Sequence, residues 1–371
     1  MNPFAFGSVV WIVVAAFVAL FLPSVMRTKE PPTLDDQDSQ HIHDMGVPRL
    51  GGVIVLCIMW AALLSQQAAV LPEIKLLLAC ATPAFVVGLL EDVLHSTSPW
   101  TRYAGCIASS FILVAIIGPI PRFDIGFLDV ILTSGIAATL VSVFCIAGVT
   151  QAFNIVDGKN GLSSGMALIA LFGLTITGWS IGDEVLAKSI SLMAMPVLGF
   201  WCVNIIRGRL FLGDSGAYLL GFIVAACGLL TTIRNPTLSP WLPVVLAAYP
   251  IVETLFTFLR RVVIEQKRFS DPDFLHMHSL IYDRLIRAHS GSSTRRRKLG
   301  NSLSALILLA GSMGIAAIAL NFLGSSLALQ WLFLGYVVCY LSAYRGVRRL
   351  QRAEPLTAAQ VDQAKAATDK R

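Results

Sequence analysis

Long apolar runs recur along almost the whole chain of 371 residues and constrain its fold more than any other feature. A transmembrane helix needs about 20 mostly apolar residues to cross the hydrocarbon core of a bilayer. We therefore expect an all-α, polytopic integral membrane protein, with one transmembrane domain over residues 1–345 and a cytoplasmic tail over 346–371. Eleven spans are predicted, over approximately Phe6–Met26, Leu50–Val70, Ile74–Leu90, Tyr103–Ile120, Phe127–Val149, Leu162–Ser180, Val185–Ile205, Ala217–Ile233, Trp241–Leu259, Leu303–Phe322 and Leu327–Tyr344.

The positions of the basic residues orient these spans. About 24 of the 28 Lys and Arg residues fall on one side of the predicted membrane, and only Lys75, Arg122, Lys188 and Arg234 fall on the other. Loops rich in Lys and Arg stay in the cytoplasm. The sequence therefore predicts an external N-terminus and a cytoplasmic C-terminus. Membrane orientation also accounts for the net charge of +6, so no nucleic-acid partner is expected.

Two adjacent acids, Glu91 and Asp92, follow the third span at its cytoplasmic end. Carboxylates at a helix C-terminus oppose the helix dipole, and the adjacent like charge adds to that cost. A bound cation or a proton-transfer task would offset the cost. The plainer interpretation is a solvated pair at the membrane surface, and the residues alone leave both interpretations open.

The connection between the fifth and sixth spans has the sequence Asn154-Ile-Val-Asp157-Gly-Lys-Asn160-Gly-Leu. Asp-Gly and Asn-Gly are turn dipeptides, so we expect a tight loop lined by amide and carboxylate groups. Such a loop suits a polar ligand that is held by backbone N–H groups and side chains together. The alternative is a simple turn between two helices.

Asp214 lies in Phe211-Leu-Gly-Asp-Ser-Gly216, between the seventh and eighth spans and after Arg207 and Arg209. It could be the N-cap of the eighth helix. A helix N-terminus also binds anions. An acid beside basic residues at that place suits a cation that bridges a carboxylate and a phosphate, and this role is compatible with capping.

The long basic connection after the ninth span contains Asp271-Pro-Asp273-Phe-Leu-His276-Met-His278. Two histidines at this spacing bind zinc only with further ligands, and neither a cysteine nor an HExxH motif lies nearby. Imidazoles among arginines suit a phosphate group instead. The alternative is a solvated loop with incidental histidines.

Two further charges lie in or beside the spans. Glu253, inside the ninth span, is a candidate functional residue by its position, or it extends toward Arg260 or Arg261 at the membrane surface. Arg49, which precedes the second span, is a candidate phosphate contact or an ordinary basic anchor.

The order of these segments resembles the polyprenyl-phosphate N-acetylhexosamine-1-phosphate transferases, the glycosyltransferase family that includes WecA, TagO and MraY. The Pro-Arg-Leu-Gly-Gly and His-x-His segments resemble the WecA and TagO branch. The matching segments are Val47-Pro-Arg-Leu-Gly-Gly52, Gly88-Leu-Leu-Glu-Asp92, Asn154-Ile-Val-Asp-Gly-Lys-Asn-Gly-Leu162, Phe211-Leu-Gly-Asp-Ser-Gly216, Pro250-Ile-Val-Glu253 and His276-Met-His278.

The resemblance implies an enzyme of the bacterial inner membrane with its active site on the cytoplasmic face. Such an enzyme transfers an N-acetylaminosugar 1-phosphate, for which we expect GlcNAc 1-phosphate, from a UDP-sugar to undecaprenyl phosphate. UMP leaves, and the product starts a lipid-linked cell-envelope glycan such as O-antigen. Mg²⁺, which Mn²⁺ could replace, would neutralise the diphosphate, and a homodimer is left open.

The resemblance also implies roles for individual residues. Asp92, supported by Glu91, would deprotonate or orient the lipid phosphate, and Asp157 would be an acid close to the reacting phosphates. Asp214 would bind magnesium, with Asn154 as a second ligand. The substrate-binding residues would be Arg49, Gly158, Lys159, Asn160, Phe211, His276 and His278, with Phe211 stacking on uracil.

Four positions depart from the family pattern. Glu91 replaces the first Asp of the usual acid pair, and His95 lies where some members carry Lys. Asn160 stands where many bacterial members carry Asp, and Ser279 ends the usual His-x-His-His segment. The longer Glu91 side chain moves its carboxylate, and an amide at Asn160 cannot act as an acid.

Two other functions are alternatives. A secondary transporter would place polar groups near the bilayer midplane and often shows repeated halves, whereas the polar motifs here lie at cytoplasmic helix ends, apart from Glu253. Within the family, an MraY-type enzyme that uses a muramyl-pentapeptide nucleotide is the alternative. The segment around His276 argues against it.

The predicted topology can be tested by cysteine labelling in intact cells. In a background without the seven native cysteines, Asn235→Cys should react with a membrane-impermeant maleimide and Ser292→Cys should not. The reason is that the basic loop containing Ser292 is expected to stay inside. External labelling of Ser292→Cys would overturn the orientation and place the polar motifs on the wrong face.

Overall fold

The structure, a computed structural model, describes residues 3–25, 48–66, 70–208, 210–266, 273, 275–283 and 294–353. Every regular element within these ranges is a helix, which confirms the predicted all-α class. The elements are α1 (Pro3–Val25), α2 (Gly51–Ser65), α3 (Pro72–Cys80), α4 (Thr82–Leu94), α5 (Pro99–Ile117), α6 (Gly126–Leu132), α7 (Gly135–Ile155), α8 (Leu162–Ser180), α9 (Glu184–Arg207), α10 (Gly213–Arg234), α11 (Trp241–Leu246), α12 (Ala248–Phe258), the π-helical turn η3 (Leu259–Ile264), α13 (Met277–Ile281), α15 (Thr294–Ala319) and α16 (Ser326–Ala353).

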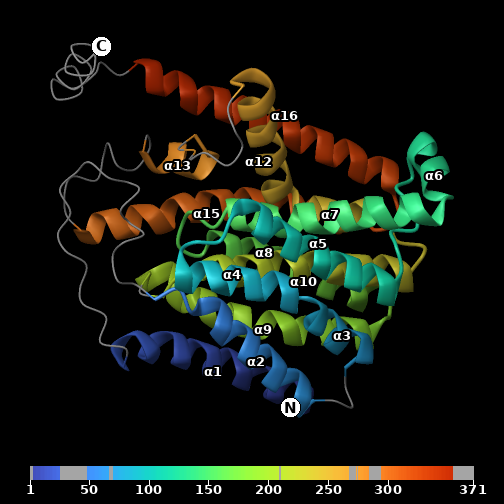
Figure 1. Cartoon of the computed structure of the whole chain (residues 1–371), viewed down its shortest axis with the longest axis horizontal. Helices are drawn as coiled ribbons and strands as arrows, with labels where there is room; N and C mark the ends of the chain where they lie inside the picture. The colour runs from blue at the N-terminus through green and yellow to red at the C-terminus, as the bar shows by residue number, and fades with distance from the viewer. Residues whose placement is uncertain are drawn as a thin grey trace.

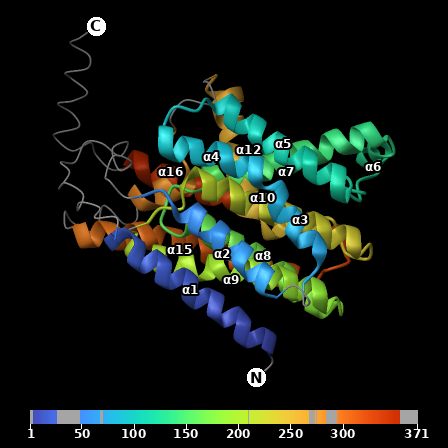
Figure 2. The same cartoon turned by 60° about the horizontal axis from the view of Figure 1, so that its bottom comes forward.

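The long helices form a bundle around α10. Most of them run side by side, whereas α16 crosses the bundle obliquely (Figure 1). α10 contacts α2, α4, α7 and α8 and is the most buried of the candidate membrane spans. Figure 2 shows it between α4 and α8, with α1 on the outside of the bundle against α9. The elements that pack on the start of α10 can therefore meet at one place.

Several helices are long and apolar enough to cross a membrane. Seven of the described helices meet that requirement, and α3 with α4 makes an eighth if the bent pair is one span. Gly51–Ser65 and the Val9–Pro23 part of α1 are shorter apolar helices. The chain is thus a multi-pass membrane protein, while the number of eleven spans and the orientation of the termini stay predictions.

Two spans predicted as single helices are interrupted by proline. α3 and α4 meet at Ala81 with a bend of 40°, and α11 and α12 meet at Ala247. Proline lacks an N–H group, and its ring clashes with the carbonyl four residues earlier. Pro83 and Pro250 lie two and three residues after the breaks, so the carbonyl four residues before each proline belongs to the preceding helix.

The predicted fifth span, Phe127–Val149, is wrong in its boundaries. The short helix α6 is separate, and α7 begins after Ser134 and continues to Ile155. Ser134-Gly135 is a turn dipeptide inside an otherwise apolar run, and this signal explains the break. The later end of α7 places Asn154 in its last turn rather than in the following loop.

Other boundaries also differ from the expectation. α2 ends at Ser65 rather than near residue 70, and α16 continues past residue 345 as far as Ala353. The expected boundary between domain and tail therefore falls inside a helix. The polar segment 355–371 lies outside the described residues.

Two glycines allow α2 and α4 to contact the first turn of α10 closely. A Cβ atom at Gly52 would lie 2.3 Å from the backbone nitrogen of Gly216, and one at Gly88 would lie 2.6 Å from Cα of Ser215. No side chain fits at such separations without moving a backbone. This close packing fixes the end of α4, where Asp92 lies, against the start of α10.

Candidate active site

The carboxylate of Asp92, in the last turn of α4, binds the N-terminus of α10. Its Oδ1 accepts a hydrogen bond from the N–H of Asp214 at 2.9 Å. Its Oδ2 accepts from the N–H of Ser215 at 2.9 Å and from the Ser215 hydroxyl at 2.7 Å. The first N–H groups of a helix have no partner within it, and the dipole favours an anion there. Asp92 therefore caps α10 from a neighbouring helix.

This arrangement corrects the predicted capping role of Asp214. The N-cap position is Leu212, which makes no side-chain capping bond, and Asp214 lies within the first turn. Gly213 has φ +77°, and a Cβ atom there would lie 2.5 Å from Oδ2 of Asp92. Glycine at this position therefore permits the backbone conformation and admits the Asp92 carboxylate.

The segment that carries Arg49 pairs with the residues before α10. Phe211 N–H donates to the Pro48 carbonyl at 3.1 Å, and Gly51 N–H donates to the Phe211 carbonyl at 3.0 Å. The N–H group of the next residue, Gly52, donates to the Leu212 carbonyl at 2.9 Å. Two sequence motifs that lie about 160 residues apart are thereby joined through backbone hydrogen bonds.

Arg102, in the first turn of α5, links the two acidic motifs. Its Nη1 donates to Oδ2 of Asp214 at 2.8 Å and lies 3.8 Å from Oε1 of Glu91. Glu91 also accepts hydrogen bonds from the N–H and the hydroxyl of Thr97. The adjacent acids therefore have different partners: Asp92 holds α10, whereas Glu91 holds the turn before α5 and supports Arg102.

Asp157 lies in the loop after α7 and faces the same acids. Burial raises its pKa well above the ordinary value, and the carboxylates of Asp214 and Asp92 raise it further, whereas Arg49 lowers it. Charges act on a pKa in this way when they lie close together. Asp92, Asp157, Asp214 and Arg49 therefore lie near one another at one end of the bundle.

The next residues of the same loop contact α13 and the residues that follow it. The His278 ring packs on Gly158, where a Cβ atom would lie 2.4 Å from Nε2. Lys159 Nζ lies 4.2 Å from the ring centroid of Tyr282, a cation–π geometry. Burial lowers the pKa of Lys159 to about 8, although Asp283 raises it. Burial, then His276 and Lys159, lower the pKa of His278 well below its ordinary value, so this imidazole is neutral at pH 7.

His276 has a different environment from His278. Its Nδ1 lies 3.0 Å from Oε1 of Glu253, and its Nε2 lies 3.6 Å from Oδ2 of Asp273. Asp273 in turn forms an ion pair with Arg260. The rings of the two histidines are thus parallel, with centroids 5.4 Å apart, but each histidine contacts different residues. Whether either contacts a diphosphate stays a prediction.

The remaining predicted residues lie around this region. Asn160 N–H donates to Oδ1 of Asn301 at 3.4 Å, and the Asn160 amide packs on Gly208 at the end of α9. Asn154 and Phe211 are half-buried. Arg209 and Asp271 lie outside the described residues, so the structure does not place them.

Two residues of the site were not predicted from the sequence as site residues. Arg102 was counted only as a loop charge, although a cation in the first turn of a helix opposes the dipole. That mismatch is a signal that an acidic partner is near. Ser215, which binds Asp92, carries no comparable signal, because serine is common at any helix start.

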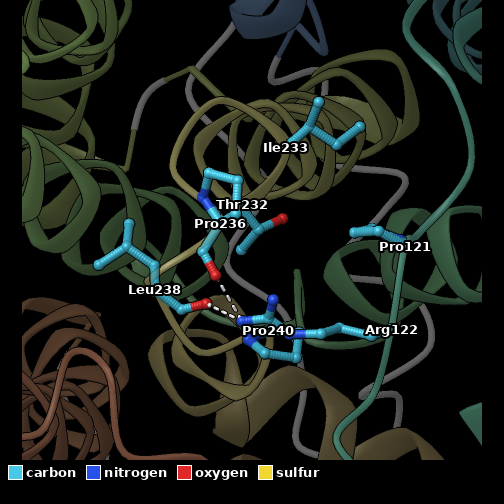
Figure 3. A pocket seen from close by; sticks show the side chains of 7 residues that line it. All are labelled: Pro121, Arg122, Thr232, Ile233, Pro236, Leu238 and Pro240. Carbon is cyan, nitrogen blue, oxygen red and sulfur yellow. Dashed lines mark hydrogen bonds between the residues drawn. The ribbon is translucent and has the colours of Figure 1, made fainter.

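A cavity of about 120 Å³ lies at the opposite end of α10 (Figure 3). The Arg122 side chain lines it and donates to the carbonyls of Pro236 and Leu238 at 2.6 and 3.0 Å. Its lining contains no acid. A helix of 22 residues such as α10 is about 33 Å long, so this cavity is separate from the convergent aspartates. It is lined by Pro121, Arg122, Thr232, Ile233, Pro236, Leu238 and Pro240.

Comparison with known proteins finds similarity to one family. Residues 74–232 match the profile of glycosyl transferase family 4. The chain is similar to this family over these residues. The matched range includes Asp92, Asp157 and Asp214 and ends near the C-terminus of α10, so it contains the part of the bundle in which these three aspartates meet.

Three bacterial proteins are similar to the chain over most of their own length. The chain is 28% identical over 273 residues to a probable undecaprenyl-phosphate N-acetylglucosaminyl 1-phosphate transferase of Bacillus subtilis, covering 73% of this chain and 75% of the relative. It is 26% identical over 326 residues to an undecaprenyl-phosphate alpha-N-acetylglucosaminyl 1-phosphate transferase of Thermotoga maritima, covering 87% and 92%. It is also 26% identical over 280 residues to a phospho-N-acetylmuramoyl-pentapeptide-transferase of Bacillus pumilus, covering 70% and 83%.

Replacing Arg102 tests how the site is held together. Arg102→Met removes the hydrogen bond to the Asp214 carboxylate. A hydrogen bond to a charged group contributes about 1.5–3 kcal/mol, which corresponds to about 10- to 100-fold in rate if it is lost in the transition state. We expect a loss of that size in transferase activity of purified membranes. Lys188→Met is the control, because the exposed Lys188–Glu184 pair lies at the other end of the bundle and contributes little. Full activity in Arg102→Met would show that Asp214 does not need this partner.

Proposed function

We propose that this protein transfers N-acetylglucosamine 1-phosphate from UDP-GlcNAc to undecaprenyl phosphate and releases UMP. The observation that carries the proposal is the convergence of three aspartates with Arg49 and Arg102 where α4 ends and α10 begins. Alternating acids and bases of this kind suit a diphosphate and its cation. The names of the Bacillus subtilis and Thermotoga maritima relatives support the sugar and the lipid.

The donor chemistry of the site fits a magnesium ion. Burial raises the pKa of Asp157 most, and the carboxylates of Asp214 and Asp92 raise it further, so a cation bound there would favour the ionised form. Within the described ranges no three His, Cys, Asp or Glu side chains form a preformed metal cage. Mg²⁺ commonly uses one or two carboxylates together with water and substrate phosphates. Asp214 and Asp157 are the proposed carboxylate ligands, with Asn154 as a neutral one.

Mg²⁺ would supply charge neutralisation at the phosphates during the transfer. The reaction forms a bond from an acceptor phosphate oxygen to the β-phosphorus and breaks the bond from that phosphorus to UMP. Phosphoryl transfer depends mostly on positioning and electrostatics. In this chain Arg49 and Arg102 lie where they can attract the diphosphate. Asp92, whose oxygens already accept three hydrogen bonds, is better suited to orienting the site than to removing a proton.

The loop after α7 is the proposed uridine site. Gly158, Lys159 and Asn160 follow Asp157 directly, so a nucleotide bound there would extend its phosphates toward the aspartates. Phe211, joined by backbone hydrogen bonds to the segment that carries Arg49, is the proposed stacking partner for uracil. The predicted topology would place this whole region on the cytoplasmic face, where UDP-sugars are made.

A muramyl-pentapeptide nucleotide is the second candidate donor. The Bacillus pumilus relative bears the name of such an enzyme, and the chemistry at the diphosphate would be the same. The family similarity favours both donors over a transporter. The two donors differ only in the sugar and its substituents, so the assay must offer both.

Purified protein, undecaprenyl phosphate and Mg²⁺ should release UMP from UDP-GlcNAc and not from UDP-MurNAc-pentapeptide. Asp214→Asn should lower turnover by about 100-fold or more, the scale of losing a principal electrostatic group. Asp183→Asn is the matched control. Asp183 caps α9 and binds Arg234, and Asn caps a helix as well as Asp does.

Three results would contradict the proposal. No UMP release from either nucleotide would reject the activity, and release from the pentapeptide nucleotide alone would change the donor. Unchanged turnover of Asp214→Asn at limiting Mg²⁺ would remove Asp214 from the metal site.

A further inference from the structure

Glu253 is a fully buried acid in α12 and has no solvent exposure. A carboxylate in an apolar interior costs several kcal/mol unless charged or hydrogen-bonding partners surround it. Such a residue in a membrane span is a functional candidate. None of the tasks proposed above uses Glu253, so its partners must explain its presence.

The partners of Glu253 come from two other parts of the chain. Oε1 lies 3.0 Å from Nδ1 of His276 and accepts from the N–H of Met277 at 3.2 Å. Oε2 accepts from the hydroxyl of Tyr340, on α16, at 2.8 Å and from the same Met277 N–H at 3.3 Å. One carboxylate therefore joins α12 to α16 and to the first residues of the His-x-His segment.

The structure does not show the predicted alternative, in which Glu253 extends toward Arg260 or Arg261. Arg260 pairs with Glu265 at 3.0 Å and with Asp273. Glu253 instead points toward His276 inside the bundle. Its position is set by the histidine segment and not by the basic membrane surface.

Contacts at Glu253 also fix His278. α13 has only five residues and begins at Met277, whose N–H group is bound by Glu253. His278 is the next residue, and its ring packs both on the His276 ring and on Gly158 of the proposed uridine site. A short helix has little rigidity of its own. The orientation of both histidines therefore depends on the carboxylate to which the segment is anchored.

We propose that Glu253 is a positioning residue, which holds His276 and His278 against the loop of Gly158 and takes its own orientation from Tyr340 of α16. This inference rests on the proposed function, because it assigns the two histidines to the same site. The proposed positioning role implies that α16, which carries none of the family motifs, contributes to the reaction. The contacts themselves can be tested independently of turnover.

The first test uses two changes at Glu253. Glu253→Gln keeps the size but leaves one acceptor oxygen, so at least one of the three donors faces an N–H₂ group. We expect kcat for UMP release to fall about 10- to 100-fold, the usual effect of losing a group that orients a functional residue, with a smaller change in KM. Glu253→Asp keeps both oxygens on a shorter side chain and should recover part of the loss.

A combined variant tests whether Glu253 acts through the two histidines. If it does, adding Glu253→Gln to His276→Ala and His278→Ala should make that variant no slower. Losses that multiply would show that Glu253 acts by another route and would overturn the proposal.

Tyr340 offers a matched pair of conservative changes. Tyr340→Phe removes only the hydroxyl bound to Glu253, and we expect a several-fold loss of kcat. Tyr344→Phe, one turn later on the same helix, removes a buried hydroxyl that makes no hydrogen bond and should keep normal turnover. Equal effects of the two changes would contradict the proposal even if Glu253→Gln does not fold.

Hydrogen exchange separates this inference from the proposed function. Amides of residues 276–281 should exchange faster in Glu253→Gln than in the wild type, whether or not the protein releases UMP. An inactive wild type with this exchange result rejects the proposed function alone. Unchanged exchange beside an active wild type rejects the positioning role.

Discussion

The hydrogen bonds between Asp92 and the start of α10 are the contacts on which the site depends. They join the end of α4 to the most buried candidate span. A buried helix N-terminus needs a partner for its free N–H groups, and in this chain a carboxylate from another helix supplies it. Asp214 lies in the turn that this contact fixes, so its direction toward Asp157 and Arg102 follows from the capping geometry.

Much of this arrangement follows from sequence pattern. Apolar length predicts a helix at each proposed span, and turn dipeptides with acids predict the polar loops that meet near α10. The breaks within predicted spans were harder to predict, because the length of an apolar run gives no sign of an interruption inside it. Pro83, Pro250 and Ser134-Gly135 interrupt helices by removing a donor or favouring a turn, and each is a short signal within a long apolar run.

The pairing of side chains could not be read from the motifs. Glu91 and Asp92 are neighbours in sequence, yet one binds Thr97 and the other binds α10. His276 and His278 share a motif, yet one contacts Glu253 and the other packs on Gly158. These choices depend on which distant helix lies next to each residue. Sequence spacing predicts a shared region, whereas tertiary packing determines the partner.

The central claim is that Asp92 acts by holding the first turn of α10. Hydrogen exchange of the amides of Asp214 and Ser215, compared between the wild type and Asp92→Ala, tests it most directly. Both N–H groups bind Asp92 in the structure, so we predict much faster exchange in the variant together with lost turnover. Lost turnover with unchanged exchange at these two amides would contradict the account, because Asp92 would then act on the reactants and not on the helix.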